Sequence, residues 1–334
     1  MAILVTGGCG YIGSHTIVDL LSNGYEVISV DNNSRSSPKQ LYGVEKITGK
    51  KILNYSTDLC DLEQTRIIFR NHPIEGIIHF AAYKSVDESV QNPWLYFQNN
   101  LVSQINVLQC AAEFNIQNFV FSSSCSVYGN ADEIPVTEET PLKNAESPYG
   151  RTKQIGEDLI RDIAKVSSTR FVLLRYFNPV GAHPSTIIGE VPFGKPSNLI
   201  PAITQFAAGR LPLLNVYGAD YDTRDGSCIR DFIHVCDIAH AHTQALGRLI
   251  KGPQDNCEIF NLGTGNGVTV LEAIHSFERI SGKKLDYKIA DRRPGDVVAI
   301  YANNNKARQF LEWVPQYTLD DMMKTAWKWE KELI

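Results

Sequence analysis

The sequence has no excess of positive charge and no long apolar run. Its 32 lysine and arginine residues are outnumbered by 37 aspartate and glutamate residues, which gives a net charge of −5 over 334 residues. A chain of this charge has no general attraction for nucleic acids or acidic membranes. No apolar stretch approaches the roughly 20 residues of a membrane-spanning helix. We therefore expect neither a nucleic-acid partner nor a membrane partner, and any anionic ligand must be bound by local donors.

The sequence also lacks paired cysteines. Seven cysteines are scattered along the chain, and none shows the CxxC spacing of a zinc site or a redox motif. An odd number of isolated thiols argues against a disulfide framework, and we expect no metal site. The opening residues Met1–Val5 lack a basic segment and lead into a glycine-rich turn, so they indicate a first strand and not a signal peptide. These features favour a cytoplasmic protein.

Short apolar runs alternate with helical patterns through the first half of the chain. The runs are rich in β-branched residues, as expected of strands buried on both faces of a sheet. They comprise Ala2–Thr6, Glu26–Val30, Ile52–Tyr55, Gly76–Phe80, Asn118–Ser122 and Phe171–Arg175. The helical patterns between them include Tyr11–Ser22, Leu62–Arg70, Tyr96–Glu113 and Tyr149–Lys165. This alternation predicts an α/β protein with a Rossmann-type, doubly wound parallel sheet.

The regular alternation ends after Arg175. Glycine and proline become frequent between Pro179 and Pro212, and the elements beyond them are short. Helical patterns return over His234–Leu249, Val270–Ile280 and Leu319–Lys331. We therefore predict a Rossmann domain over residues 1–176 and a smaller, mixed α/β domain over residues 177–334, with some crossing of the chain between the two.

A glycine-rich turn joins the first expected strand to the first expected helix. Gly7, Gly10 and Gly13 form a GxxGxxG pattern, whose missing side chains let a pyrophosphate approach backbone N–H groups at a helix start. Asp31 ends the second strand, where a carboxylate can accept hydrogen bonds from an adenosine ribose. Its negative charge repels a 2′-phosphate, whereas Arg35, further along the turn, is expected to be solvated. These features predict NAD, and not NADP, as the cofactor.

A serine, a tyrosine and a lysine form the second candidate site. Ser124 follows the fifth expected strand, and Ser147 is a favourable cap for the helix that carries Tyr149 and Lys153. Tyrosine and lysine four residues apart share one helix face. A free phenol titrates near pH 10, but the lysine ammonium, the helix N-terminus and oxidised nicotinamide are each expected to lower its pKa. The phenolate then takes a proton from an alcohol while hydride leaves the same carbon. The alternative is a surface Tyr–Lys pair.

These motifs resemble those of the extended short-chain dehydrogenase/reductases, and among them the UDP-glucose 4-epimerases. The similarity covers essentially the whole chain. Its segments are Thr6–His15, Phe80–Val86, Asn99, Ser122–Gly129, Ser147–Lys153, Arg175–Pro184, Asn198-Leu199, Arg230–Val235, Asn261–Gly263 and Arg292–Asp296. It implies interconversion of UDP-galactose and UDP-glucose by hydride transfer from C4 to bound NAD, rotation of the 4-keto sugar and return of hydride. It also implies that residues 1–176 bind NAD and residues 177–334 bind the nucleotide sugar.

The resemblance assigns roles to individual residues. It makes Tyr149 the catalytic base, with Ser124 in its proton network and Lys153 on the nicotinamide ribose. The implied cofactor contacts are Gly7, Gly10, Tyr11, Ile12, Gly13, Asp31, Asn32, Asp58, Leu59, Phe80, Ala81, Lys84, Asn99, Ser122, Tyr149, Lys153 and Tyr176. The implied substrate contacts are Lys84, Ser124, Tyr149, Asn178, Asn198, Leu199, Val216, Tyr217, Arg230, Arg293, Asp296 and Ile300. Ala82 stands where these epimerases usually carry glycine.

Ile300 matches the family position that closes the hexose pocket near the C2 substituent. A tyrosine there leaves room for a hydroxyl only, and a small residue admits an N-acetyl group. Isoleucine is smaller than tyrosine but branched and stiff at χ1. The resemblance therefore implies UDP-glucose and UDP-galactose as the better pair, with slower conversion of N-acetylated sugars. A UDP-N-acetylglucosamine 4-epimerase or a dual-specificity enzyme is the alternative.

The same motifs also bear on other functions that a member of this superfamily could have. A nucleotide-sugar 4,6-dehydratase needs an acid and a base after the fifth-strand hydroxyl, usually Asp-Glu, but Cys125-Ser126 stands there. A decarboxylase or reductase of the superfamily is harder to exclude. A non-catalytic NAD-binding regulator tends to lose the tyrosine or lysine, and both are present. Because Tyr96–Glu113 and Tyr149–Lys165 match the helices of a four-helix interface in the superfamily, we expect a homodimer.

Overall fold

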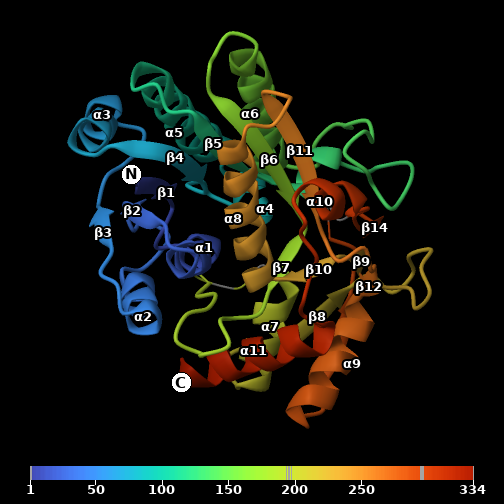
Figure 1. The fold of residues 1–334 in the computed structure, drawn as a ribbon. Helices are drawn as coiled ribbons and strands as arrows, with labels where there is room; N and C mark the ends of the chain where they lie inside the picture. Colours follow the sequence, from blue (N-terminus) through green and yellow to red (C-terminus); the bar gives the residue numbers. More distant parts are fainter. Residues whose placement is uncertain (1, 193, 195, 197, 294–296, 334) are drawn as a thin grey trace.

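A seven-stranded parallel sheet forms the centre of the molecule (Figure 1). The computed structural model describes residues 2–333 except 193, 195, 197 and 294–296. The strand order is β11-β6-β5-β4-β1-β2-β3, and every neighbouring pair runs parallel. The strands are β1 Ala2–Thr6, β2 Glu26–Val30, β3 Leu53–Tyr55, β4 Ile74–His79, β5 Asn118–Ser124, β6 Arg170–Tyr176 and β11 Cys257–Leu262. The predicted doubly wound sheet is confirmed.

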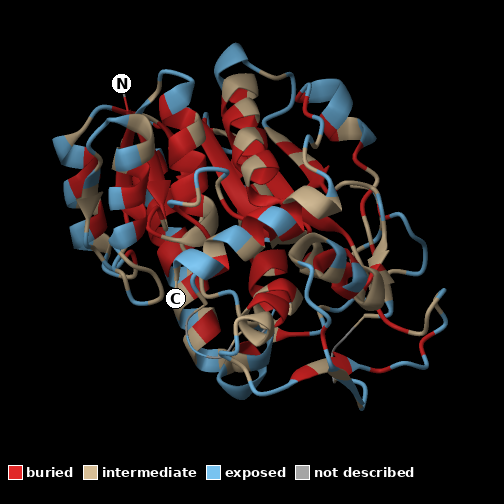
Figure 2. Cartoon of the chain, turned by 90° about the horizontal axis from the view of Figure 1, so that it is seen from below, coloured by how far each residue is buried: buried red, intermediate tan, exposed pale blue. Residues whose placement is uncertain are grey.

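Helices cover both faces of this sheet. One face carries α1 Tyr11–Ser22, α2 Lys39–Thr48 and α8 Val235–Lys251, and the other carries α3 Leu62–Asn71, α5 Pro93–Glu113 and α6 Pro148–Ala164. Alternate residues of β1 divide between the two cores: Ile3 and Val5 pack on the first face, Ala2 and Leu4 on the second. Figure 2 shows the strands buried between helices whose outer surfaces are exposed. Burial on both faces explains why these strands are continuous apolar runs.

The carboxyl ends of the strands meet at one edge of the sheet. Thr6 of β1 is paired in register with Val30 of β2 and with His79 of β4. Ser124 of β5 is paired with Tyr176 of β6. In open sheets of this kind, ligands bind outside the carboxyl ends where the strand order reverses. The glycine turn and the expected serine therefore lie at the same edge.

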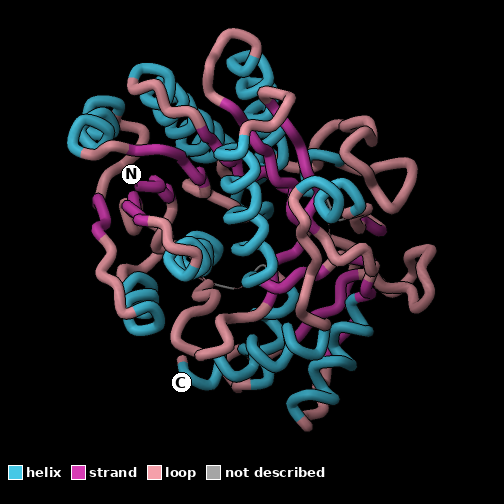
Figure 3. Tube along the Cα trace, in the orientation of Figure 1, coloured by secondary structure: helices cyan, strands magenta, loops and turns pink. Residues whose placement is uncertain are grey.

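The second half of the chain builds a smaller unit from short elements joined by loops (Figure 3). Its strands are β7 Asn178–Val180, β8 Leu214–Tyr217, β9 Ile229–Arg230, β10 Phe232–His234, β12 Val268–Thr269, β13 Tyr287–Ala290 and β14 Ala299–Ile300. Its helices are α7 Leu199–Ala207, α9 Val270–Ser281, α10 Asn305–Phe310 and α11 Leu319–Glu332. A separate apolar core, with Ile203, Phe277 and Met322 at its centre, holds this unit together.

Two elements of the second half return to the sheet. Strand β11 pairs with β6 at the edge, and α8 packs against α1 (Figure 1). The domain boundary at residue 176, and the crossing of the chain expected with it, stay predictions. Within the described ranges, no helix combines the length and the apolar character needed to cross a membrane.

Candidate active site

The turn between β1 and α1 is packed too closely for side chains. Gly7 has a φ of +69°, and a Cβ there would lie 3.0 Å from the backbone nitrogen of Ala81. A Cβ on Gly13 would lie 2.2 Å from the carbonyl oxygen of Gly7. Gly10 caps α1 without a side-chain hydrogen bond. The N–H groups at the start of α1 are therefore available to an anion, as a dinucleotide requires.

Asp31 stands beside this turn in a fixed orientation. One carboxylate oxygen accepts a hydrogen bond from the Cys9 backbone N–H at 3.0 Å. The other accepts from the Asn33 N–H at 2.9 Å and from the Ser36 hydroxyl at 2.7 Å. Asn33 has a φ of +57°, and its side-chain oxygen is buried without a hydrogen-bond partner among the described residues. The residues after β2 thus fit the ribose of an adenine nucleotide, and Cys9, Asn33 and Ser36 were not predicted.

The predicted serine, tyrosine and lysine come together between β5 and α6. The Ser147 hydroxyl caps α6 by accepting from the Gly150 N–H at 3.1 Å. Tyr149 and Lys153 then follow on the buried face of the helix, 9% and 5% exposed. Lys153 Nζ donates to the Ser122 carbonyl at 2.6 Å, and the Ser124 hydroxyl is hydrogen-bonded to the phenol of Tyr149. The alternative of a surface Tyr–Lys pair is therefore excluded.

Ser126 extends this hydroxyl network and was not predicted. Its hydroxyl donates to Ser124 Oγ at 2.9 Å, and its backbone N–H is 3.2 Å from the same oxygen. The Ser124 hydroxyl, saturated as an acceptor, is left to donate to Tyr149. On the other side, the Ser122 hydroxyl is hydrogen-bonded to Tyr176. A residue with a hydroxyl two places after the strand-end serine is the signal that identifies this position.

Burial acts on the two titratable groups in opposite directions. It raises the pKa of Tyr149 well above its ordinary value, although the hydrogen bond from Ser124 lowers it in part. Burial lowers the pKa of Lys153 to about 8, against the charge of Glu157. The predicted lowering of the tyrosine pKa is therefore wrong for the polypeptide alone. Desolvation of the phenolate outweighs the hydrogen bond from Ser124.

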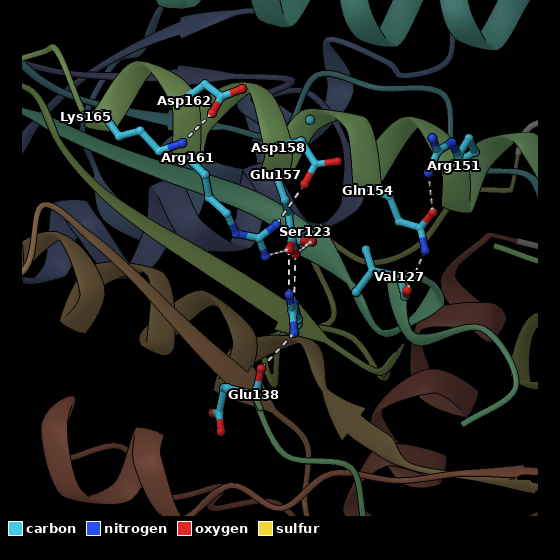
Figure 4. A network of polar contacts seen from close by, with 12 residues as sticks. Ser123, Val127, Glu138, Arg151, Gln154, Glu157, Asp158, Arg161, Asp162 and Lys165 are labelled. Carbon is cyan, nitrogen blue, oxygen red and sulfur yellow. Dashed lines mark hydrogen bonds and ion pairs between the residues drawn. The ribbon is translucent and has the colours of Figure 1, made fainter. Parts of the chain in front are cut away.

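A buried ion pair anchors the helix that carries these groups (Figure 4). Arg175 of β6 donates to both carboxylate oxygens of Glu157, at 2.8 and 2.6 Å, and the two side chains are 1% and 0% exposed. The Ser123 hydroxyl donates to Glu157 at 2.6 Å. Arg175 also donates to the phenol of Tyr128 at 3.0 Å. The sequence contained the signal: an arginine within an apolar strand requires a buried partner.

The remaining predicted cofactor residues lie around the same edge. Tyr11 OH donates to the carbonyl of Gly181 at 2.5 Å, and the Thr6 hydroxyl accepts from the Ala81 N–H at 3.2 Å. Lys84 is instead paired with Glu190 at 2.7 Å, so in this structure its ammonium is held by the second half of the chain. Ile12 lies in the first turn of α1, and Asp58 and Leu59 lie between β3 and α3. Asn32 follows β2, Phe80 follows β4, and Asn99 lies in α5.

The predicted substrate residues come from the short elements of the second half. Asn178 begins β7, and its side-chain oxygen is buried without a hydrogen-bond partner within the described part of the chain. Arg230 Nη1 donates to the carbonyls of Ile229 and Val297 at 2.9 and 2.7 Å. Arg293 lies 3.6 Å from Asp87 and 5.2 Å from the centre of the Tyr217 ring. Asn198 and Leu199 begin α7, Val216 lies in β8, and Asp296 lies outside the described residues.

Arg292 and Arg293 also line a cavity of about 440 Å³. The other lining residues are Asn130, Ala131, Tyr221, Val298 and Ala299. The Arg292 guanidinium lies 4.3 Å from the centre of the Tyr221 ring. Aromatic and guanidinium groups around one hollow suit a nucleotide with a base and phosphates. Asn130, Tyr221 and Arg292 were not predicted as site residues.

Among the described residues, no group of three or more histidine, cysteine or acidic side chains is arranged to hold a metal ion.

The sheet, the glycine turn and the buried Ser–Tyr–Lys group define an extended short-chain dehydrogenase/reductase. The family model described as GDP-mannose 4,6 dehydratase matches residues 4–326. UDP-glucose 4-epimerase of Bacillus subtilis is 46% identical over 331 residues, which cover 99% of this chain and 97% of that protein. The chain belongs to the UDP-glucose 4-epimerase family.

Solved structures agree with this assignment. UDP-glucose 4-epimerase from Bifidobacterium longum, in complex with NAD+ and UDP, is 44% identical with a TM-score of 0.95, covering 99% of this chain and 98% of that one. The UDP-Glc/GlcNAc 4-epimerase of Campylobacter jejuni is 35% identical with a TM-score of 0.85, covering 99% of both chains. The family predicted from the sequence motifs is confirmed.

Proposed function

We propose that this chain is a UDP-hexose 4-epimerase that interconverts UDP-galactose and UDP-glucose with NAD as its cofactor. The observation that carries the proposal is the buried group of Ser124, Tyr149 and Lys153 at the carboxyl edge of the sheet. Relatives that match nearly the whole chain are UDP-glucose 4-epimerases, and the Bifidobacterium enzyme holds NAD+ and UDP. The enzyme class and the cofactor expected from the sequence are confirmed by these relatives.

The cofactor site is built from the turn at Gly7 and the carboxylate of Asp31. NAD bound there would supply the hydride acceptor and donor for C4 of the sugar. The helix start after Gly10 offers N–H groups to the pyrophosphate, and Asp31 accepts from the ribose hydroxyls. Lys153, one turn after Tyr149, would donate from its ammonium to the nicotinamide ribose. Because the reaction has no net redox change, the cofactor stays bound through turnover.

Tyr149 moves the proton. Its phenol takes the proton of the C4 hydroxyl as hydride leaves, and returns it when hydride comes back to the other face. Ser124 donates a hydrogen bond to the phenol oxygen and stabilises its charged form, while Ser126 fixes the Ser124 hydroxyl. Since burial raises the pKa of Tyr149, the charge of Lys153 and the charge of oxidised nicotinamide must together offset it.

The nucleotide is held apart from the reacting sugar. Arg230 and Arg293 suit the diphosphate, because guanidinium groups bind phosphate oxygens in a bidentate manner. The Asn178 side-chain oxygen is buried and has no hydrogen-bond partner among the described residues, so it is ready to accept one from the substrate. Tyr217, beneath the Arg293 guanidinium, suits the base. A firm grip on the nucleotide leaves the hexose able to turn between the two hydride transfers.

The residues after β5 disfavour the dehydratase named by the family model. Elimination of water needs an acid and a base beside the tyrosine, whereas Cys125 and Ser126 follow Ser124 here. Burial raises the pKa of Cys125 to about 12, so its thiol is neutral and a poor acid at neutral pH. A non-catalytic regulator is disfavoured because Tyr149 and Lys153 are both in place. The 4-epimerase therefore fits the site best.

We also propose a homodimer formed through α5 and α6. Val102 and Ile105 on α5 are apolar yet 37% and 45% exposed, and Leu159 of α6 is only half-buried. Two copies of each helix would cover these side chains. Light scattering on the purified protein tests this, and Ile105→Glu is expected to give monomers. A monomeric wild type at micromolar concentration would contradict the proposal.

The seven thiols are all free, which supports the cytoplasmic location expected from the sequence.

A direct assay separates the three functions. The purified protein is incubated with UDP-galactose, and the nucleotide sugars are resolved by anion-exchange chromatography while bound nucleotide is measured in an acid extract. The proposal requires UDP-glucose as the product and NAD in the extract. A 4-keto-6-deoxy product would show a dehydratase, and bound NAD without any turnover would show a regulator.

A further inference from the structure

An ion pair joins the segments that follow β2 and β4. Arg35 Nη2 lies 2.7 Å from a carboxylate oxygen of Glu88, and the Arg35 guanidinium lies 4.9 Å from the centre of the Tyr83 ring. The hydroxyls of Ser34 and Tyr83 are 3.5 Å apart. Strand β1 lies between β2 and β4 in the sheet. The two segments therefore meet across the carboxyl end of β1, where the glycine turn lies.

Glu88 is held in place to make this pair. It lies in the first turn of α4, Val86–Gln91, which the Ser85 hydroxyl caps. Its second carboxylate oxygen accepts from the Tyr96 phenol at 2.7 Å, and Tyr96 is fully buried. Burial tends to raise the pKa of Glu88, but the hydrogen bonds from Tyr96 and Arg35 bring it below its ordinary value. The carboxylate is therefore ionised and aimed at Arg35 throughout the neutral pH range.

Arg35 is the one cationic residue of the turn that begins at Asp31 and ends before Pro38. It directly precedes Ser36, whose hydroxyl donates to the Asp31 carboxylate. In sheets of this type, an acidic residue at this place binds the ribose 2′-hydroxyl of NAD, whereas a nearby arginine accommodates the 2′-phosphate of NADP. This turn contains both residues. Which cofactor it selects depends on where the Arg35 guanidinium is held.

We propose that Glu88 is a cofactor-specificity residue: it holds the Arg35 guanidinium away from the ribose 2′ position beside Asp31 and so keeps the site selective for NAD. The inference rests on the proposed NAD site. Two barriers then act against NADP. The Asp31 carboxylate repels the 2′-phosphate, and Glu88 withholds the cation that would attract it. The sequence alone indicates a solvated Arg35, so the second barrier follows only from the contact with Glu88.

The ion pair is suited to a mutational test. Both side chains are one-third exposed, and pairs at this exposure contribute little to stability. Glu88→Gln removes the charge but keeps an oxygen that can accept from Tyr96 OH. Asp31→Asn removes the first barrier and keeps one oxygen for the N–H groups of the turn. Melting temperatures of the variants confirm that each full-length protein is folded.

The test measures bound nucleotide and not turnover. Each protein is equilibrated with equal concentrations of NAD and NADP, separated from free nucleotide, and extracted for chromatography. Asp31→Asn alone is expected to raise the ratio of bound NADP to NAD. Adding Glu88→Gln to it is expected to raise the ratio about tenfold to hundredfold further, the value of one charge-assisted hydrogen bond to a phosphate.

A third variant identifies the cation. Arg35→Met in the Asp31→Asn/Glu88→Gln background keeps most of the aliphatic stem and is expected to return the ratio to that of Asp31→Asn. The proposal is overturned if Glu88→Gln leaves the ratio of Asp31→Asn unchanged, or if Arg35→Met fails to reverse the gain. A protein that binds neither nucleotide in any form would instead refute the proposed cofactor site.

Discussion

Tyr149 and Lys153 show how burial makes two residues depend on each other. Taking both out of water raises the pKa of the phenol and lowers that of the ammonium, so each is pushed toward its neutral form. A phenolate beside an ammonium is the arrangement that relieves both penalties. The pair is therefore suited to exchange a proton with a bound alcohol without leaving an isolated charge behind.

Removing the phenol oxygen tests the role of Tyr149. Tyr149→Phe keeps the ring and deletes the group that bonds Ser124 and accepts the C4 proton. We expect epimerisation to fall about 10²- to 10⁴-fold, the usual contribution of general acid–base catalysis, with the fold and bound NAD retained. Coupled assays and nucleotide extraction measure the two effects. Near-normal turnover by this variant would rule out the assigned base.

The pKa of Lys153 predicts a loss of activity at alkaline pH. Its ammonium is the required form, and burial lowers its pKa to about 8, so kcat/KM is expected to fall as the pH rises through about 8. His79 lies near Lys153, but burial lowers its pKa to about 3, so it stays neutral across this range. The Glu157 carboxylate supplies the opposing charge.

Lys153→Arg is the matched control for this profile. A guanidinium stays charged through the whole range, so the alkaline fall is expected to disappear even if the maximal rate is lower. The measurement is kcat/KM from about pH 6 to 10 in both proteins. An identical alkaline fall in Lys153→Arg would assign it to another group.

At the level of elements, three contacts join the end of strand β5 to one face of helix α6. Three successive serines of β5 meet three residues spaced by four on α6. The Ser122 carbonyl accepts from Lys153, the Ser123 hydroxyl donates to Glu157, and Ser124 bonds Tyr149. Since residues four apart share one helix face, Tyr149, Lys153 and Glu157 can all reach the end of β5, although their order along α6 differs from that of their partners along the strand. A shift of either element by one residue would separate all three pairs.

Glu157→Gln tests what the middle pair contributes. Loss of its charge leaves Arg175 buried without a counter-ion, and breaking a buried pair in this way costs about 3–5 kcal/mol of unfolding free energy. Because the charge of Glu157 raises the pKa of Lys153, its loss is expected to move the alkaline fall in kcat/KM to lower pH. Denaturant titration and the pH profile measure the two effects.

Ser123→Ala provides the comparison for Glu157→Gln. It deletes one hydrogen bond to the carboxylate and leaves the charge in place. The alkaline fall should therefore stay where the wild type has it, with only a small loss of stability of about 1 kcal/mol. If Glu157→Gln and Ser123→Ala shift the alkaline fall in kcat/KM equally, the hydrogen bond between Ser123 and Glu157, and not the charge of Glu157, controls the pKa of Lys153.

The sequence predicted the elements whose pattern is local. Strands β1 and β2 and helix α1 have the predicted bounds, and α5 begins three residues early because Pro93 suits a first helical position. Helix α2 and the pairing of β11 with β6 were not predicted. The first has a weak apolar pattern, and the second joins residues some 85 positions apart, which no local pattern reveals.

The residues of the candidate site also fall into two groups, those that a local pattern predicts and those that only the structure reveals. Tyr149, Lys153 and Asp31 follow from motif spacing, and the structure brings them to one edge of the sheet. Glu157 and Glu88 act through contacts between elements, so no single segment identifies them. The direction of the pKa of Tyr149 was missed because the sequence shows the neighbouring charges but not the extent of burial.

At the scale of the whole molecule, the proposed hexose site lies where the two halves of the chain meet. Val127 and Tyr128, after β5, pack with Phe177 and Ile300 in one small apolar cluster. Ile300 is 5% exposed and is paired in register with Arg230, the proposed diphosphate ligand. The residue expected to limit the C2 substituent is therefore fixed by contacts from both halves. Its packing leaves little freedom to move aside.

This packing predicts the sugar preference. An acetamido group forced against the buried Ile300 costs on the order of 1–3 kcal/mol, by analogy with overpacked cores, which is a tenfold to hundredfold preference. We expect a higher kcat/KM for UDP-galactose than for UDP-N-acetylgalactosamine, with the second reaction still measurable. Ile300→Tyr is expected to widen the ratio, and Ile300→Ser to narrow it.

The two variants decide between Ile300 and its neighbours. Both are compared with the wild type for kcat/KM on the two substrates, at a temperature where all three proteins are folded. Ile300→Ser leaves space in the cluster formed with Val127 and Phe177, so its melting temperature is expected to fall while its ratio narrows. Unchanged ratios in both variants would mean that surrounding loops set the pocket size. A wild type that prefers the N-acetylated pair would make this chain a UDP-N-acetylglucosamine 4-epimerase, with the same site and the same chemistry at C4.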